Sequence, residues 1–504
     1  MNQRKAGAVL SYVNILALIL VGLLYTPLML RFLGRSEYGL YALIGSFVGY
    51  LSVLDMGLGN TIIRYISINR VQGSKTREAE LNALFLLVYC GLGCFAAAIG
   101  AWIYFHLDSI FGASLTPGEL DRARLMTALL VFNIAVSFPL GLFSAVMTVY
   151  ERFIFLRVSN ILRVIINPLI VLPLLYSGYG SVMMVIVSTV LNLSCLLANA
   201  WYCFRYLHIR FRLGIYPRIF LWEIAVYSFF IFLNVVMDKI YYSTGQFILG
   251  IVSGTQAVAV YAVAIQIILM YVQFSTAISS VVFPKITRMV AGGADGDRLT
   301  DVMVKIGRLQ YIVIAYIVIM FILLGRDFLR LWAGNEYLGA YPIILLLMAG
   351  LFTPLIQNAG ISILQAENRN KFRMIVYILC AASSVFISAP LAKTYGGLGC
   401  AMGSGLSMIV STGFIMNWYY QKRIGIRLGR FWGNILRMTV GVALFAGCAY
   451  GLCHYWLTDV NWITFIAAAA LCTLVYVPIM YLISFNAYEK ELCKTCLIRF
   501  GVKF

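Results

Sequence analysis

The stretch LSYVNILALILVGLLYTPLML, residues 10–30, carries no charged side chain. A helix rises 1.5 Å per residue, so about twenty such residues cross the roughly 30 Å hydrocarbon core of a bilayer. A second run of this kind, ITFIAAAALCTLVYVPIMYLI, occupies residues 463–483, and others lie between the two. The run at 10–30 is longer than a signal-peptide core and no small-residue cleavage site follows it, so we expect it to be a retained span.

The composition of the whole chain agrees with a lipid environment. Of the 504 residues, 62% are hydrophobic and 11% are charged, against about 45–50% and about 25% in soluble domains. A water-soluble fold has too little interior to bury so much apolar surface. The sequence therefore predicts an all-α, polytopic membrane protein.

The cysteines do not indicate a metal or a cofactor. Most of the eleven lie inside apolar runs, where they act as small hydrophobic residues. Cys493 and Cys496 have Cys-x-x-Cys spacing, but no second pair and no histidine lies near them. We therefore expect no metal site and no bound cofactor.

Apolar runs bounded by charged or Gly/Pro-containing loops predict fourteen transmembrane helices. Their approximate cores are 9–30, 38–62, 81–106, 123–149, 154–176, 181–204, 222–250, 256–283, 308–331, 341–364, 373–392, 397–420, 433–456 and 461–484. In the span 341–364, Pro354 and its polar neighbours predict a kink whose freed carbonyls are met by side chains or water.

The basic residues support this count. An even number of spans puts both termini on one side, where the loops hold 29 of the 38 lysines and arginines, against 7 on the other side. Positively charged loops stay in the cytoplasm, so we expect both termini to be cytoplasmic. The basic loops that orient the protein in the membrane then account for the net charge of +19, and nucleic acid is not expected as a partner.

A short sequence element occurs twice. Phe32-Leu33-Gly34 is followed by Tyr41-Ala42-Leu43, and Ile248-Leu249-Gly250 is followed by Tyr261-Ala262-Val263. Six predicted spans separate the copies, which gives both the same orientation. This predicts a parallel repeat, as in transporters built from two similar halves.

Six stretches carry a resemblance to a known family: FLGRSEYGLYAL (32–43), LDMGLGNTIIRYI (54–66), YAVAIQI (261–267), FPKITRMVAGG (283–293), KIGRL (305–309) and GLGCAMGSG (397–405). With these stretches in this order and at this spacing, the chain resembles the oligosaccharide/polysaccharide flippases of the multidrug/oligosaccharidyl-lipid/polysaccharide exporter superfamily. This superfamily includes O-antigen and capsule repeat-unit flippases.

The resemblance implies two six-helix lobes around a central cavity, residues 1–213 and 214–425, with two accessory helices and a tail in 426–504. It also implies alternating access in the bacterial cell membrane. The implied substrate is an isoprenoid diphosphate-linked oligosaccharide, moved from the cytoplasmic to the outer leaflet for surface polysaccharide biosynthesis. Membrane lipids, and a polysaccharide polymerase and glycosyltransferases of the same pathway, are the other expected partners.

Such a substrate needs a polar, preferably cationic route through the bilayer, because bare sugar and diphosphate are costly in hydrocarbon. In the fifth span, Asn160, Arg163 and Asn167 share one helix face. Arg163 lies about 14 Å deep at 1.5 Å per residue. It is either a cavity cation for the diphosphate or sugar, or a helix-packing arginine.

The seventh span carries Asn234, Asp238 and Lys239. Ionisable residues this deep are rare unless they are paired or in contact with water. Lys239 is a candidate headgroup cation, Asn234 a candidate polar contact and Asp238 a candidate ion-coupling site. The alternative is that the two charges neutralise partners on other helices.

Further candidates lie in the second and eighth spans. Asp55, followed by Gly57 and Gly59, could couple transport to Na⁺ or H⁺, or form a structural ion pair. Arg64 could recruit the entering diphosphate, or simply anchor the span. Gln266 and Gln273, seven residues apart on one helix face, are candidate contacts for sugar hydroxyls.

Three other functions remain open. A drug or cation exporter of the same superfamily would favour acidic cavity residues, whereas Arg163 and Lys239 favour anionic cargo. A lipid-linked peptidoglycan precursor flippase is close in mechanism, but length and motifs fit it less well. A membrane glycosyltransferase or polymerase generally needs a large extramembrane loop, and here no predicted loop is much longer than about thirty residues. We therefore expect a transporter and not an enzyme.

Overall fold

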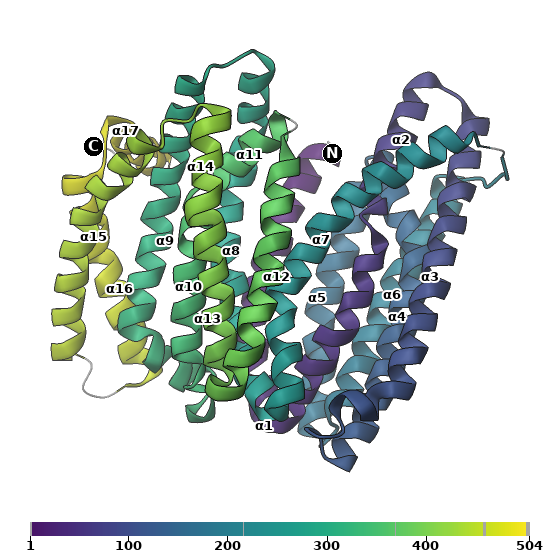
Figure 1. Cartoon of the computed structure of the whole chain (residues 1–504), viewed down its shortest axis with the longest axis horizontal. Helices are drawn as coiled ribbons and strands as arrows, with labels where there is room; N and C mark the ends of the chain where they lie inside the picture. Colours follow the sequence, from purple (N-terminus) through teal and green to yellow (C-terminus); the bar gives the residue numbers. More distant parts are fainter. Residues whose placement is uncertain (1–2, 215, 368, 457–459, 500–504) are drawn as a thin grey trace. The chain divides into compact units, whose positions relative to one another are not determined.

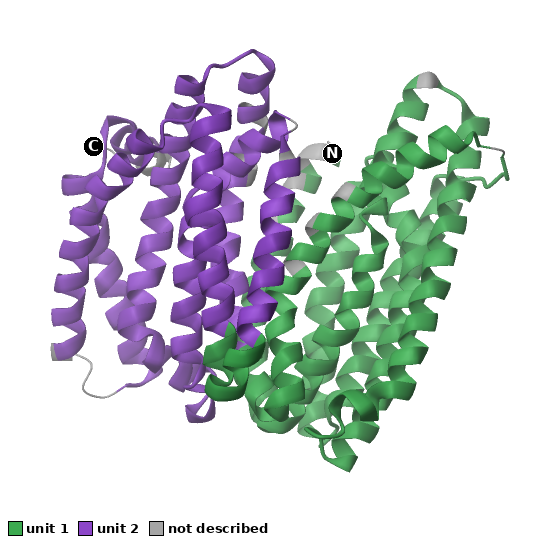
Figure 2. Cartoon of the chain, in the orientation of Figure 1, with its two compact units in different colours: residues 1–262, 389–400 green, residues 263–388, 401–504 purple. Residues whose placement is uncertain are grey.

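The computed structural model describes residues 3–214, 216–367, 369–456 and 460–499, and this part of the chain is helical with no strand. It divides into two compact units, residues 1–262 with 389–400 (unit 1) and residues 263–388 with 401–504 (unit 2) (Figure 2). The boundaries between the units fall inside three helices, α8 (Gly254–Ala291), α12 (Asn370–Tyr395) and α13 (Gly397–Met408). The two six-helix lobes that the family resemblance implies, with their boundary at residue 213, stay a prediction.

Unit 1 is a bundle of long helices (Figure 1). Its elements are α1 (Gln3–Val48), the 3₁₀ helix η1 (Gly49–Asp55), α2 (Leu58–Gln72), α3 (Lys75–Phe111), α4 (Pro117–Val149), α5 (Phe153–Tyr176), α6 (Ser181–Tyr206), α7 (Arg218–Val252) and the start of α8 (Gly254–Ala291). Its core is apolar; Phe85, Leu142 and Cys203 pack together with almost no exposed surface.

Unit 2 contains the remaining helices (Figure 1). They are most of α8, then α9 (Gly296–Trp332), η2 (Asn335–Tyr337), α10 (Ala340–Ile356), α11 (Asn358–Ala366), α12 (Asn370–Tyr395), α13 (Gly397–Met408), the π-helical turns η3 (Ile409–Met416) and η4 (Tyr420–Ile424) around α14 (Asn417–Tyr419), α15 (Leu428–Trp456), α16 (Trp462–Ile479), the π-helical η5 (Met480–Ser484) and α17 (Ala487–Arg499).

Membrane-spanning helices are present as predicted, but the predicted number of fourteen is not confirmed. Among the described residues, twelve helices are long and apolar enough to cross a bilayer, or thirteen if a bent pair counts as one span. One of the twelve, Val9–Val71, has 63 residues and contains two of the predicted cores, 9–30 and 38–62. Gly34, at φ 72° and ψ 176°, interrupts the helical backbone within it.

The bent pair is the segment in which Pro354 predicts a kink. Helices α10 and α11 meet at 45° on either side of Gln357. At this bend the backbone carbonyl of Leu355 accepts a 2.7 Å hydrogen bond from the Ser275 hydroxyl. The kink and the side-chain contact to a carbonyl are both confirmed.

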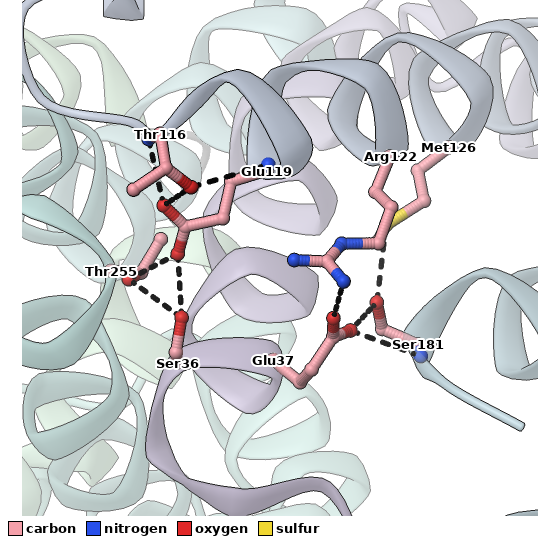
Figure 3. A network of polar contacts seen from close by, with 8 residues as sticks. All are labelled: Ser36, Glu37, Thr116, Glu119, Arg122, Met126, Ser181 and Thr255. Atoms are coloured by element: carbon pink, nitrogen blue, oxygen red, sulfur yellow. Dashed lines mark hydrogen bonds and ion pairs between the residues drawn. The ribbon is translucent and has the colours of Figure 1, made fainter. Parts of the chain in front are cut away.

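Two glutamates hold helix ends together in unit 1 (Figure 3). Glu119 is 6% exposed and accepts hydrogen bonds from the Ser36 hydroxyl at 2.5 Å, the Thr116 backbone N–H at 2.9 Å and the Thr255 hydroxyl at 2.9 Å. Thr116 completes a capping box with Glu119 at the start of α4. One buried carboxylate therefore joins the starts of α4 and α8 to the residues after the Gly34 break.

Glu37, the neighbour of Ser36, fastens two further segments (Figure 3). Its carboxylate lies 2.8 Å from the Arg122 guanidinium and accepts hydrogen bonds from the backbone N–H and hydroxyl of Ser181, at the start of α6. The neighbouring residues Ser36 and Glu37 thus connect the starts of α4, α6 and α8 at one end of unit 1.

In unit 2, α17 is fastened by a buried ion pair. The Arg308 guanidinium of α9 donates to both carboxylate oxygens of Glu489, at 2.6 and 2.8 Å, and the side chains are 5% and 2% exposed. Arg308 also donates to the carbonyls of Ser484 at 2.7 Å and Asn434 at 3.3 Å. A single side chain therefore holds α15, η5 and α17 against α9.

Candidate functional site

Unit 1 contains a cavity of about 420 Å³ between the break before α2 and helices α3 to α6. Its polar lining includes Asp55, Asn60, Tyr89, Ser144, Asn160, Arg163 and Asn199. Because all of these helices belong to membrane-spanning segments, this is a polar chamber at the depth where the chain is otherwise apolar. Such chambers are typical of membrane transporters.

A break in the backbone shapes one wall of the cavity. Met56 and Gly57 adopt left-handed conformations, at φ 49° and 64°, between η1 and α2. A β-carbon at Gly57 would collide with Ile231 of α7, so both the conformation and the space require glycine here. Gly57 is therefore part of a helix interruption, whereas Gly59 lies within the first turn of α2.

Asp55 sits at this break with its carboxylate held in place. It accepts hydrogen bonds from the Gly57 backbone N–H and from the Tyr89 hydroxyl of α3. The N-terminal end of α2 carries the positive end of the helix dipole, which favours a carboxylate. Asp55 therefore has a structural role at the break between η1 and α2, as well as a place in the cavity lining.

Arg163 lies on the opposite side of the lining, on α5. One of its terminal nitrogens donates a short hydrogen bond to the Asn192 side-chain oxygen of α6. Asn192 in turn donates to Asn133 at 2.9 Å and to Ser137 at 3.0 Å, both on α4. The two readings of Arg163 are thus compatible, because it packs against a neighbouring helix and also lines the cavity.

The polar contacts continue along the seam between these helices. Asn199 of α6 donates to the Ser144 hydroxyl at 3.1 Å, and Asn167 of α5 donates to the Ser188 hydroxyl at 3.0 Å. Asn160 lines the cavity and donates to its own helix, at the Leu156 carbonyl. These side-chain amides therefore donate to hydroxyls and to a backbone carbonyl, while the buried side-chain oxygen of Asn199 accepts no hydrogen bond from the described residues.

The guanidinium of Arg163 keeps unused donors. In the described part of the chain, its one hydrogen bond goes to Asn192, while the group has five N–H donors. The remaining donors are available to an anion in the cavity. The charged side chains of the lining are Asp55 and Arg163, one of each sign.

The structure brings together only some of the predicted site residues. Asp55, Asn160 and Arg163 line one cavity, and Asn167 is two turns further along the same helix than Asn160. Arg64 is exposed on α2, one turn after Asn60, with its guanidinium 4.6 Å from the ring centroid of Tyr227. Arg64 is therefore near the cavity but not in its lining.

Lys239 is on α7, outside the lining. Its ammonium nitrogen lies against Gly49 of η1, 3.3 Å from where a β-carbon would be. Over the described residues, no hydrogen bond or ion pair of this ammonium is found. The side chains of Asn234 and Asp238 lie outside the described part of the structure. Gln266 and Gln273 belong to the portion of α8 in unit 2 and do not line the unit 1 cavity.

Sequence reasoning missed three polar residues of this site. Asn192 and Asn199 are seven residues apart on α6 and so share a face, which is the same signal that singles out Asn160 and Asn167 on α5. Tyr89 carried no such signal, because its role depends on Asp55 in another helix. In the residues searched, no group of three or more His, Cys, Asp or Glu could hold a metal ion.

Comparison with known proteins identifies the chain. A family model described as "Polysaccharide biosynthesis protein" matches residues 4–290, more than half of the sequence. The chain belongs to this family. Among curated relatives, this polysaccharide biosynthesis protein is 21% identical over 407 residues to a Shigella flexneri protein described as a candidate O-antigen transporter, covering 79% of this chain and 92% of the relative.

Solved structures show the same fold at low identity. The lipid II flippase MurJ, in an inward closed conformation, matches 96% of this polysaccharide biosynthesis protein and 100% of its own chain, with a TM-score of 0.74 and 15% identity. An inward-facing multidrug resistance MATE transporter matches 80% of this chain and 95% of its own, with a TM-score of 0.67 and 15% identity. The protein is therefore a multi-pass membrane protein of the polysaccharide biosynthesis family, and it shares its fold with the MurJ flippase and a MATE transporter.

Proposed function

We propose that the protein flips an isoprenoid diphosphate-linked oligosaccharide from the cytoplasmic to the outer leaflet of a bacterial cell membrane by alternating access, with both termini cytoplasmic. The observation that supports this most is Arg163, whose unused N–H donors line a membrane-embedded cavity next to side-chain amides. A guanidinium suits a phosphate, and amides suit sugar hydroxyls. The family and the O-antigen relative point to the same cargo.

The diphosphate and sugar would enter the cavity while the isoprenoid chain stays in lipid. Arg163 would contact the negative charge, with Asn160 and Asn199 towards the sugar. Arg64, exposed one turn from Asn60, would meet the diphosphate before entry. Lys239, Asn167, Asn234, Gln266 and Gln273 are proposed as further substrate contacts, and Na⁺ or H⁺ at Asp55 or Asp238 as the coupling ion.

Export measured in cells that lack their own flippase tests this proposal. Arg163→Gln keeps a polar side chain but removes the charge, so we expect surface polysaccharide to fall at least about tenfold, which corresponds to the loss of one charge-assisted contact. Arg163→Lys should retain part of the activity. Arg205→Gln removes an exposed cation near the end of α6, outside the lining, and should export normally.

Membrane levels of each variant must be equal for the comparison to hold. If Arg163→Gln and Arg205→Gln export alike at equal levels, the cationic cavity does not carry the substrate. A polymerase or glycosyltransferase of the same pathway is proposed as a partner only, and sugar transfer by the purified protein would contradict the transporter assignment.

A drug or cation exporter is the second candidate, and Asp55 is the observation that favours it. An acidic residue in the cavity suits a cationic cargo, and a MATE transporter shares the fold. Asp55→Asn distinguishes the two: resistance to cationic drugs would fall if the cargo is cationic, while polysaccharide export would fall if Asp55 couples flipping to an ion.

A further inference from the structure

Unit 2 has a cavity of its own, about 700 Å³ in volume, where α12 begins and η4 ends. Its lining consists of three cations and three aromatic side chains: Arg369, Lys371, Arg423, Phe372, Trp418 and Tyr419. No lining residue is acidic. Candidate spans start at Lys371 and end at Ile424, so the cavity lies where two membrane-spanning helices reach the water interface.

The chain holds its cations around this cavity by backbone contacts. A terminal nitrogen of Arg369 donates a 2.8 Å hydrogen bond to the backbone carbonyl of Arg423, which ties the loop before α12 to the end of η4. The carboxylate of Glu367 lies 3.6 Å from Arg369. Glu367 is thus the acidic neighbour of Arg369, and it does not belong to the lining, which holds three basic side chains and therefore an excess of positive charge.

The aromatic residues form a wall next to the cations, in which Phe372 and Tyr419 are nearly parallel and Trp418 is tilted by 47° from Phe372. Phe372 and Tyr419 stack with ring centroids 4.1 Å apart and an interplanar angle of 10°. Trp418 lies 6.4 Å from Phe372 by ring centroids and is 54% exposed. Aromatic side chains with an exposed tryptophan are typical of the headgroup level of a membrane.

Two exposed apolar rows lead away from this wall. On α12, Ile375 and Leu379 follow Phe372 at helical spacing and are 56% and 61% exposed. On the neighbouring segment, every fourth residue from Leu406 to Trp418 is an exposed apolar side chain: Leu406, Val410, Phe414 and Trp418. A hydrocarbon chain could follow these rows, whereas a soluble anion would gain nothing from them.

We propose that this cavity binds the phosphate-bearing headgroup of a membrane lipid of net negative charge, with the lipid's chains lying along the exposed apolar rows. The shared chemistry is a phosphate ester anion, with no cation in the headgroup to neutralise it, attached to hydrocarbon. Its source is either an anionic phospholipid, with one phosphodiester, or an isoprenoid diphosphate. The site lies entirely within unit 2 and does not depend on the function proposed for the unit 1 cavity.

Lipid retention by the full-length protein, measured by native mass spectrometry, tests this proposal. The probes are phosphatidylglycerol, phosphatidylcholine and undecaprenyl diphosphate added to the detergent-purified protein. The double variant Lys371→Gln with Arg423→Gln removes two charges but keeps the Arg423 carbonyl that Arg369 contacts. We expect retention of at least one anionic lipid to fall about tenfold or more, given the strength of charge-assisted hydrogen bonds to phosphate.

The matched control is Lys422→Gln, which removes an exposed cation next to Arg423 that does not line the cavity. This change should alter retention less than about twofold, because an exposed charge contributes little. Charge-preserving Lys371→Arg with Arg423→Lys should restore most of the binding, which separates loss of charge from loss of fold.

The outcomes assign the source or refute the site. Preference for undecaprenyl diphosphate identifies the isoprenoid source, and preference for phosphatidylglycerol identifies the phospholipid. The proposal is wrong if phosphatidylcholine is retained as well as both anionic lipids, or if Lys422→Gln has the same effect as the double variant. It is also wrong if inorganic pyrophosphate binds at the same concentration as the lipids, because the apolar rows would then have no role.

Discussion

Replacing Arg308 by methionine removes the group that holds α17 and η5 to α9. The Glu489 carboxylate, 2% exposed, would lose both hydrogen bonds from the guanidinium and keep the one from the Asn486 backbone N–H at 2.9 Å. The carbonyls of Ser484 and Asn434 would also lose a donor. Breaking a buried pair in this way typically costs about 3–5 kcal/mol.

The loss comes mainly from the uncompensated charge, and a second variant shows this. Arg308→Met with Glu489→Leu removes both charges, and it leaves the two carbonyls without their donor and the Asn486 N–H without its acceptor. At about 1 kcal/mol for each of these neutral hydrogen bonds, the double variant should lose about 3 kcal/mol or less. Adding Glu489→Leu to Arg308→Met should therefore raise the free energy of unfolding above that of Arg308→Met alone.

Equilibrium unfolding of the purified protein in mixed micelles, followed by tryptophan fluorescence, measures these differences. Arg427 and Asp297 provide the matched control, since they pair at the same kind of distance, 2.7 Å, but are 66% and 45% exposed. Arg427→Met should cost less than about 1 kcal/mol. The reasoning fails if Arg308→Met costs no more than Arg427→Met, or if the double variant is less stable than Arg308→Met alone.

Three further expectations follow from unit 1. Glu119→Gln should lower the free energy of unfolding by about 1.5–3 kcal/mol, because an amide cannot accept all the hydrogen bonds that the carboxylate accepts. The control is Asp121→Asn at an exposed position. Measured in the same denaturation series, this variant should change the free energy of unfolding by less than about 0.5 kcal/mol. Gly57→Ala should cost more than about 1 kcal/mol of stability, since the left-handed backbone of Gly57 and the nearby Ile231 both exclude a β-carbon. Gly59→Ala should be tolerated, because the nearest atom to a β-carbon there is 3.9 Å away. Equal thermal stability of the two variants would contradict this. Asn192→Ala should reduce export with Arg163 still present, because the guanidinium loses its anchor; normal export at normal membrane levels would show that the anchor is not needed.

Much of the fold follows from local patterns in the sequence. Apolar runs predict the helices, and Pro354 predicts the bend between α10 and α11. The face shared by Asn160 and Arg163 predicts that both side chains meet the same surroundings, and both line the cavity. Each of these depends on residues within a few positions of one another, where helix geometry alone decides which side chains share a face.

Contacts between distant segments were not predictable in this way. Glu119 joins Ser36 and Thr255, and Tyr89 meets Asp55, because packing brings separate helices together. Lys239 shares the signal of a buried charge with Arg163 but does not line the same cavity. A polar residue in a span is therefore recognisable as unusual, while the neighbour that it faces depends on tertiary structure.

The contact between Arg308 and Glu489 also has a consequence for synthesis of the protein. The two residues are 181 positions apart. At about 5–20 residues per second, the ribosome needs roughly 9–36 s to pass from one to the other. During that interval the nascent arginine has no carboxylate to meet, and water or lipid phosphates must solvate it until α17 emerges. Slow decoding between these two codons would prolong the stage at which quality-control proteases can recognise the unfinished bundle.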